Sequence, residues 1–238
     1  MNIGPHTIGE GRCFVVAEAG INHGGSLSMA LQLIDAAKDA GADAVKFQTF
    51  RADELGCTPD IAKCELEPGA WPVLALHAAA RGITFFSTPF DCESVDLLDP
   101  LVPCFKIASG EITNEKLLRH VASKKKPVIL STGTADLKEI RRARQWLWGA
   151  TARPLILLHC VSAYPALVKD TNLRVLTYLG EEIWGVDAVG LSDHSLGITI
   201  PVAAVAMGAA IIEKHLTLDP KMEGPDHHMS ADPTTFRL

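Results

Sequence analysis

The chain has 238 residues, a hydrophobic content of 47% and a formal net charge of −6 at pH 7. A chain of this length and composition can bury one large core, so we expect one domain over residues 1–238. The net acidity and the lack of a long basic run exclude a general nucleic-acid-binding surface. No signal peptide, no long apolar stretch and no CxxC pair among the six cysteines occurs, which predicts a cytoplasmic protein without a membrane span.

Short apolar runs, many rich in β-branched residues, are typical of buried strands. In chain order these runs are Cys13–Ala17, Ala44–Phe47, Thr84–Phe86, Cys104–Ile107, Val128–Leu130, Leu155–Leu158, Val186–Leu191 and Ala209–Ile212. Helix-like segments separate them; in the first, Leu27, Leu31 and Ile34 recur at helical spacing after the capping candidate Ser26. The least regular stretch, Arg51–Pro68, is expected to be a long loop. Buried strands that alternate with helices predict an α/β protein, specifically a (β/α)8 TIM barrel.

Polar residues follow nearly every predicted strand at its C-terminal side. These segments are Glu18–His23, Lys46–Thr49, Ser87–Asp91, Lys106–Glu111, Ser131–Thr134, His159–Pro165, Ser192–Ser195 and Glu213–His215. Because all strands of such a barrel end at the same face, and that face carries the active site, the polar ends are expected to converge on one pocket.

Two lysines at separate strand ends, Lys46 and Lys106, indicate what this pocket binds. They are accompanied by hydroxyls at other strand ends, namely Thr88, Ser109, Ser131 and Ser192. Each hydroxyl alone is equally well explained as a capping or turn residue. Together with two cations, however, the hydroxyls suit the oxygens of a phosphate, so a phosphorylated small molecule is predicted.

Two histidines, His194 and His215, end consecutive predicted strands and are expected to be neighbours at the mouth. Two imidazoles with water suit a divalent ion such as Mn²⁺, Co²⁺ or Zn²⁺. They are fewer ligands than a structural zinc site requires, and each could instead be an ordinary hydrogen-bonded residue. Asp226–His228 follow the last strand and could add a ligand or an acid, or form a solvated loop.

The strand-end motifs together resemble those of the sialic acid synthase family. In order, they are "AEAGINHGG", "VKFQTF", "STPFD", "KIASGEITN", "STGT", "HCVSAYP", "GLSDHSLG", "EKHLTLD" and "GPDHHMS". The resemblance runs from about Cys13 to Pro233. It implies a transferase that condenses phosphoenolpyruvate with an N-acetylated amino sugar, such as N-acetylmannosamine, and releases phosphate. The product would be a nonulosonic acid of the sialic, pseudaminic or legionaminic type.

The resemblance also implies roles for single residues. The phosphoenolpyruvate site would consist of Lys46, Thr88, Lys106, Ser109, Ser131 and Ser192. The positions that match sugar-binding or reaction-centre residues are Glu18, Gln48, Glu111, Ser162, Tyr164 and Asp226. Either Glu18 or Glu111 would be the catalytic base that activates water, and His194 and His215 would hold the metal, Mn²⁺ foremost, with Mg²⁺ or Co²⁺ as alternatives. The partners implied are the two substrates, and a homodimer is allowed.

Two departures from the family pattern bear on the substrate. Neuraminate-forming members typically carry Asn where this chain has Ser162, which favours relatives that make pseudaminic or legionaminic acid. The chain also ends at Leu238, whereas typical members continue into an antifreeze-like domain that caps the partner's site, so that cap is expected to be absent.

Two other functions remain open at this point. A Schiff-base aldolase would use Lys46 or Lys106 as its nucleophile. A non-catalytic barrel that binds a sugar or a phosphate would use the same pocket without turnover.

Overall fold

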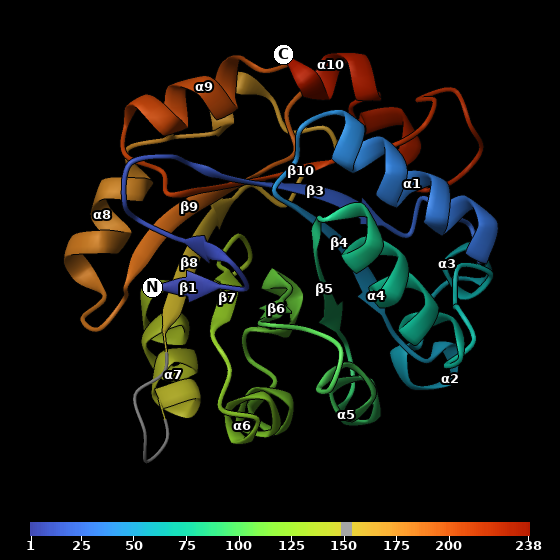
Figure 1. Ribbon diagram of the computed structural model, residues 1–238. Coiled ribbons are helices and arrows are strands. Elements are labelled where there is room, and N and C mark those ends of the chain that lie inside the picture. The colour runs from blue at the N-terminus through green and yellow to red at the C-terminus, as the bar shows by residue number, and fades with distance from the viewer. Residues whose placement is uncertain (149–153) are drawn as a thin grey trace.

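The computed structural model describes residues 1–148 and 154–238, and its centre is an eight-stranded parallel sheet. The strands are β3 (Phe14–Gly20), β4 (Ala44–Thr49), β5 (Thr84–Pro89), β6 (Phe105–Ile107), β7 (Val128–Ser131), β8 (Leu155–Cys160), β9 (Ala188–Asp193) and β10 (Ile211–His215). The last strand pairs with the first, so the sheet curls round on itself (Figure 1). Among the described residues, the ladder is interrupted only between β5 and β6, which lie side by side. The predicted (β/α)8 barrel is confirmed.

Each of the eight predicted strands is present, and most extend further toward their C-terminal ends than predicted. β3 continues to Gly20 and β10 to His215, so polar residues expected just after these strands lie within them. The ladder fixes their register: His215 is opposite Glu18, and Glu18 is opposite Lys46. The strands therefore deliver functional side chains from their own last residues rather than from the loops that follow.

Helices surround the sheet on its outer side (Figure 1). They are α1 (Leu27–Asp39), α2 (Ala52–Leu55), α3 (Pro59–Ala62), α4 (Ala70–Arg81), α5 (Cys92–Leu98), α6 (Glu115–Ser123), α7 (Leu137–Trp148), α8 (Val175–Glu182), α9 (Thr199–Ala206) and α10 (Pro233–Arg237). Single 3₁₀ turns occur at η1 (Ser109–Glu111), η2 (Val168–Asp170) and η3 (His227–Met229). The predicted cap of α1 is confirmed, because the Ser26 hydroxyl accepts a hydrogen bond from the Met29 amide at 3.3 Å.

The stretch Arg51–Pro68, expected to be a long loop, contains the single-turn helices α2 and α3. Gly56 ends α2 in a left-handed conformation, and Pro59 occupies the first turn of α3. Both are residues that local backbone preference places at helix ends. The stretch is thus folded into two turns at the rim of the barrel.

A short hairpin that the sequence does not predict precedes the barrel. It consists of β1 (Asn2–Ile3) and β2 (His6–Thr7), and the Ile3 side chain is fully buried. A methyl group at Gly4 would lie 3.5 Å from the hydroxyl of Thr84, the first residue of β5. The hairpin therefore covers the N-terminal end of the barrel, in front of the strands in Figure 1. The polar ends of the strands lie at the opposite end of the barrel.

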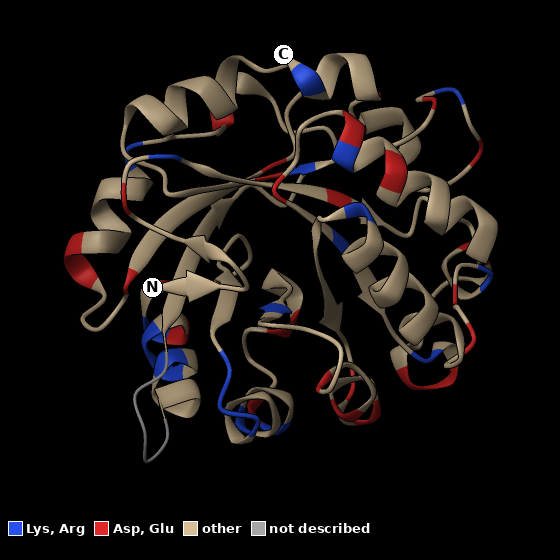
Figure 2. Cartoon of the chain, in the orientation of Figure 1, with Lys and Arg blue, Asp and Glu red and all other residues tan. Residues whose placement is uncertain are grey.

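Charged residues lie on the outer helices and also on the central strands, where both signs occur together (Figure 2). Among the described residues, no helix combines the length and the apolar character needed to cross a bilayer. The charges within the barrel are the more unusual feature, because isolated charges are costly to bury and are usually paired.

Candidate active site

Lys46 is the centre of a buried polar cluster at the C-terminal end of the barrel. Its ammonium lies 2.8 Å from Glu18 Oε2 and donates a hydrogen bond to Thr88 Oγ1 at 3.0 Å. Gln48, further along the same strand, donates from Nε2 to Glu18 Oε1 at 3.3 Å. Three neighbouring strands, β3, β4 and β5, supply these side chains, as the convergence of polar strand ends predicts.

A second carboxylate, Glu213, lies between the two lysines. Its oxygens are 3.7 Å from Lys46 Nζ and 3.8 Å from Lys106 Nζ, and Ser192 donates a hydrogen bond to Oε1 at 2.8 Å. Glu213 was not among the predicted site residues. Strand alternation could have found it, because it precedes His215 by two positions and therefore points to the same side of β10.

The two carboxylates are held in different electrostatic environments. Burial, reinforced by the neighbouring Glu213 charge and opposed by Lys46, raises the pKa of Glu18 to about 7. Burial also opposes ionisation of Glu213, but Lys106 and Lys46 together outweigh it and hold the pKa of that carboxyl below its usual value. The two carboxyl groups therefore have pKa values shifted in opposite directions. Such a pair can act in two roles, because Glu18 can exchange a proton near neutral pH while Glu213 stays charged.

The two lysines differ as well. Burial acts to lower the pKa of Lys46, but Glu18 and Glu213 outweigh it and raise the value. For Lys106, burial prevails and the pKa is lowered. Lys46 is therefore a fixed cation, whereas Lys106 has the lowered pKa that a Schiff-base nucleophile would need.

His194 and His215 lie together at the mouth with their ring centroids 5.6 Å apart. The ring of Tyr164 is 4.3 Å from that of His194. Nδ1 of His194 is hydrogen-bonded to the carbonyl oxygen of Val161 at 2.7 Å, which orients the ring and leaves Nε2 available. Burial lowers the pKa of both histidines and so favours the neutral form that metal ligation requires.

The two histidines are donors of a kind that divalent transition ions accept. Nδ1 of His215 is buried without a hydrogen-bond partner among the described residues and lies 3.8 Å from Asp226 Oδ2. In the part of the chain that the structure describes, no group of three or more His, Cys, Asp or Glu side chains is arranged to hold a metal. Two imidazoles could thus bind an ion only together with water or substrate oxygens, which leaves coordination positions open.

The remaining predicted residues differ in their exposure. Ser131 Oγ is buried and has no partner within the described residues, so it is available to a ligand. Ser109 Oγ lies 3.5 Å from Ser162 Oγ. Glu111 Oε2 accepts a hydrogen bond from Asn114 Nδ2 at 2.7 Å rather than from a residue of the Lys46 cluster. Of the two predicted bases, only Glu18 is therefore within the buried cluster.

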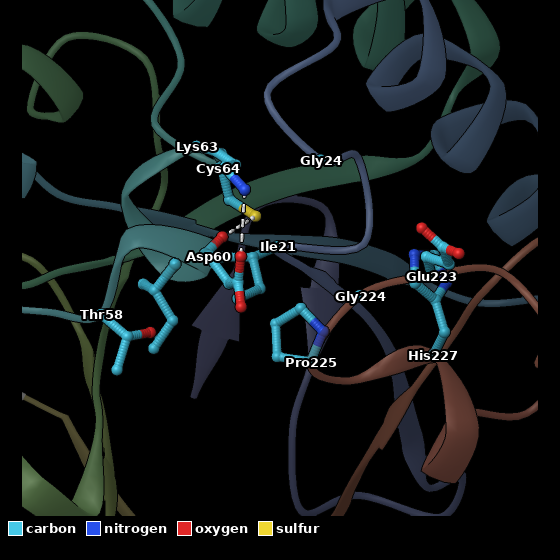
Figure 3. A pocket seen from close by; sticks show the side chains of 11 residues that line it. Ile21, Gly24, Thr58, Asp60, Lys63, Cys64, Glu223, Gly224, Pro225 and His227 are labelled. Carbon is cyan, nitrogen blue, oxygen red and sulfur yellow. Dashed lines mark hydrogen bonds and ion pairs between the residues drawn. The ribbon is translucent and has the colours of Figure 1, made fainter.

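A cavity of about 610 Å³ lies among the turn after β3, the rim segment that contains α3 and the loop after β10 (Figure 3). Its walls include Ile21, one residue beyond the end of β3, and Pro225 and His227, which flank Asp226. Asp226 itself is not a lining residue; its carboxylate lies 3.8 Å from His215, at the edge of the charged cluster.

The C-terminal mouth of this TIM barrel contains two lysines, two carboxylates with separated pKa values and two histidines. This combination is typical of the active site of an enzyme that acts on an anionic substrate. Comparison with known proteins identifies the class further. Residues 33–238 match the NeuB family, and the chain belongs to that family, as the resemblance predicts. It is therefore an enzyme of the synthase type.

Relatives with known names resemble the chain over nearly its full length. It is 45% identical to the N,N'-diacetyllegionaminic acid synthase of Legionella pneumophila, over 94% of this chain and 69% of that protein. It is 34% identical to human N-acetylneuraminate-9-phosphate synthase, over 94% of this chain and 67% of that protein. The crystal structure of the N-acetylneuraminic acid synthetase of Leptospira borgpetersenii matches with a TM-score of 0.93 at 40% identity, over 100% of this chain and 85% of that one.

Proposed function

We propose that the chain condenses phosphoenolpyruvate with an N-acylated amino sugar, giving a nonulosonic acid and inorganic phosphate. The observation that carries the proposal is the buried cluster of two lysines and two carboxylates, in which Glu18 pairs with Lys46 and Glu213 lies 3.7 Å from Lys46 and 3.8 Å from Lys106. The family assignment and the names of the relatives support this choice of reaction.

Phosphoenolpyruvate would be held by the lysines and the hydroxyls. Lys46 and Lys106 supply positive charge to the phosphate and carboxylate oxygens, at a depth where water screens little. Ser131, whose hydroxyl is buried without a partner among the described residues, would donate to the same oxygens. Thr88, Ser109 and Ser192 complete the proposed set.

Glu18 is our proposed base. After the new carbon–carbon bond forms, water must add to the carbon that bears the phosphate, and its proton must be accepted. A carboxyl with a pKa of about 7 can take that proton near neutral pH. Glu111, the last residue of η1, accepts a hydrogen bond from Asn114 and remains the second candidate for this role.

His194 and His215 would hold a divalent ion, with Mn²⁺ as the first choice and Mg²⁺ or Co²⁺ as alternatives. When bound, such an ion supplies Lewis-acid polarisation of the sugar's aldehyde oxygen. The chain's own contribution is to keep both rings neutral and oriented, through burial and through the bond from His194 to Val161.

The sugar would lie against Tyr164, Asp226, Gln48 and Ser162, at the outer side of the cluster. We place the reaction in the cytoplasm, which is supported by six cysteines that are all free thiols. A homodimer also remains part of the proposal.

The test is to incubate the chain with phosphoenolpyruvate, Mn²⁺ and a panel of N-acylated sugars while following phosphate release. We expect release that needs both substrates, that stops in chelator and that returns with Mn²⁺. His194→Ala should lose most of it. Full turnover by that variant in chelator would contradict the metal site.

A Schiff-base aldolase is the second candidate, favoured by the lowered pKa of Lys106. Borohydride reduction in the presence of pyruvate separates the two. A covalent adduct on Lys106 would support the aldolase and contradict our proposal, whereas unmodified protein together with phosphate release would support it.

A further inference from the structure

Asn22 is a buried polar residue in the turn after β3, and the proposed function gives it no role. Its side chain is 2% exposed, and its amide nitrogen donates two hydrogen bonds, to the Leu216 carbonyl and to Ser230 Oγ, each at 2.9 Å. A carbonyl oxygen can only accept, so the side-chain nitrogen of Asn22 must face Leu216. Both N–H donors of this amide therefore hold the segment that follows β10.

Ser230 connects Asn22 to Asp226. Its hydroxyl accepts the hydrogen bond from Asn22 and donates one to the Asp226 carbonyl oxygen at 2.6 Å. Ser230 is itself buried, so water competes little for these two bonds. No other hydrogen bond among the described residues joins residues 218–230 to a part of the chain before β10. The backbone of Asp226 is thus attached to the turn after β3 through one serine.

The turn that carries Asn22 is fixed at several points. The Asn22 amide donates a hydrogen bond to the Ala19 carbonyl at 2.9 Å, and the Gly25 amide donates to His23 Nδ1 at 3.1 Å. Gly25 has a φ of +78°, and a side chain there would overlap the Lys63 carbonyl oxygen. The turn therefore packs directly on the backbone of the rim segment that contains α3, which makes it a firm attachment point.

The carboxylate of Asp226 lies close to two groups of the proposed reaction. Its Oδ2 is 3.8 Å from His215 Nδ1. A methyl group at Gly20 would lie 3.7 Å from the same oxygen and 3.3 Å from Glu18 Oε1. A shift of Asp226 would therefore change its distance to both groups. A misplacement of about 1 Å can slow a reaction by about 100-fold.

We propose that Asn22 and Ser230 are positioning residues that act through Asp226, by holding its carboxylate beside His215 where the acceptor sugar is bound. The inference rests on the proposed function, in which Asp226 contacts the sugar, and adds two residues to it. Binding of phosphoenolpyruvate, which is assigned to the lysines and hydroxyls, should not depend on them.

Steady-state kinetics test the proposal with the sugar that gives the most phosphate release. Ser230→Ala should lower kcat/KM for the sugar about 10-fold and leave the KM for phosphoenolpyruvate unchanged. Ser230→Thr keeps the hydroxyl and should restore most of the loss. Val95→Ala, at a fully buried residue of α5, lowers stability without touching the loop and should change neither KM.

A double-mutant cycle tests whether these residues act through Asp226. In an Asp226→Ala background, neither Ser230→Ala nor Asn22→Leu should lower kcat/KM for the sugar any further, because the group that they position is gone. Losses that multiply in the double variants would show that Asn22 and Ser230 act independently of Asp226, and would overturn the proposal.

Hydrogen exchange in peptides that cover residues 219–229 tests the attachment without turnover. Exchange should be about 10-fold faster in Ser230→Ala than in the wild type and close to the wild type in Ser230→Thr. Ser28→Ala, at an exposed residue of α1, should change nothing.

The two measurements separate the two levels of inference. If phosphate is released but Ser230→Ala leaves the sugar kinetics unchanged, the positioning proposal is wrong and the proposed function stands. If no sugar supports phosphate release, the proposed function is wrong. Hydrogen exchange then decides the attachment of Asp226 by itself, since faster exchange in Ser230→Ala supports it and equal exchange overturns it.

Discussion

Lys46 is the residue on which the charge balance of the mouth depends. It is 3% exposed and close to both Glu18 and Glu213. Lys46→Met would leave two buried carboxylates with one lysine. We expect the free energy of unfolding to fall by about 3 kcal/mol and the affinity for phosphoenolpyruvate to fall about 10- to 100-fold.

Urea unfolding and calorimetric titration measure these two effects. Lys116→Met, at an exposed lysine of α6, should change neither. Unchanged affinity in Lys46→Met would show that the substrate binds elsewhere.

His23 makes stability depend on pH. It is buried, its Nδ1 accepts a hydrogen bond from the Gly25 amide at 3.1 Å, and burial lowers its pKa to about 4. The unfolded chain binds the proton more readily than the folded chain, since the reference pKa is 6.5. The stabilisation is thus complete above pH 6.5 and is lost as the pH falls through 4, by about 3 kcal/mol.

His23→Asn keeps an acceptor near Gly25 but cannot be protonated in this range. The difference in unfolding free energy between pH 7 and pH 4 should therefore be about 3 kcal/mol smaller in the variant than in the wild type. His228→Asn, at an exposed histidine, should leave this difference unchanged. Equal pH dependence in wild type and His23→Asn would contradict the assignment.

Single site residues were predictable to different degrees from sequence. Lys46, Thr88 and Glu18 could be placed together because each ends a strand of a recognisable barrel. Glu213 was missed because a carboxylate beside a lysine and a histidine was interpreted as part of a polar strand end, without following the alternation of side chains. The pairing of Glu213 with two lysines depends on distances between separate strands, and a linear pattern contains no such distances.

At the scale of elements, the end of β9 is tied to β10 by a buried ion pair behind the histidines. Lys214 Nζ lies 2.6 Å from Asp193 Oδ2 and donates to the Ser195 carbonyl at 2.7 Å. Asp193 Oδ1 accepts from the Ser195 amide at 3.0 Å. Since His194 and His215 are adjacent in sequence to this pair, the network holds both strand ends in place.

Removing one partner of the buried pair should be strongly destabilising, and the two removals should not be additive. Lys214→Met leaves Asp193 charged and buried, and should cost about 3–5 kcal/mol of unfolding free energy. The double variant with Asp193→Asn should cost less than the sum of the two single variants. A double-mutant cycle measures the coupling, and strict additivity would show that the pair is not coupled.

The elements themselves were largely predictable, because apolar runs and helical spacing are local properties. What local pattern did not reveal was the hairpin of β1 and β2, whose strands have two residues each and are too short to show alternation. The turns α2 and α3 were also missed, since their four residues are below the length at which helical periodicity can be recognised.

At the scale of the whole molecule, the barrel has a seam. Within residues 1–148 and 154–238, β5 pairs only with β4, and β6 only with β7, whereas β3 pairs with strands on both sides. β6 is also only three residues long. With fewer ladder bonds to break, opening at the seam should require less free energy than opening elsewhere in the sheet.

Hydrogen exchange measured by mass spectrometry tests this. Peptides that contain β6 should exchange on the order of 10-fold faster than peptides that contain β3.

The proposed substrate site lies across the seam, because Lys46 on β4 and Lys106 on β6 are on either side of β5. A phosphoenolpyruvate molecule bound to both lysines would connect the two edges of the sheet. Its addition should therefore slow exchange in β6 more than in β8, which is paired on both sides. Equal slowing of β6 and β8 would mean that the ligand does not bridge the seam.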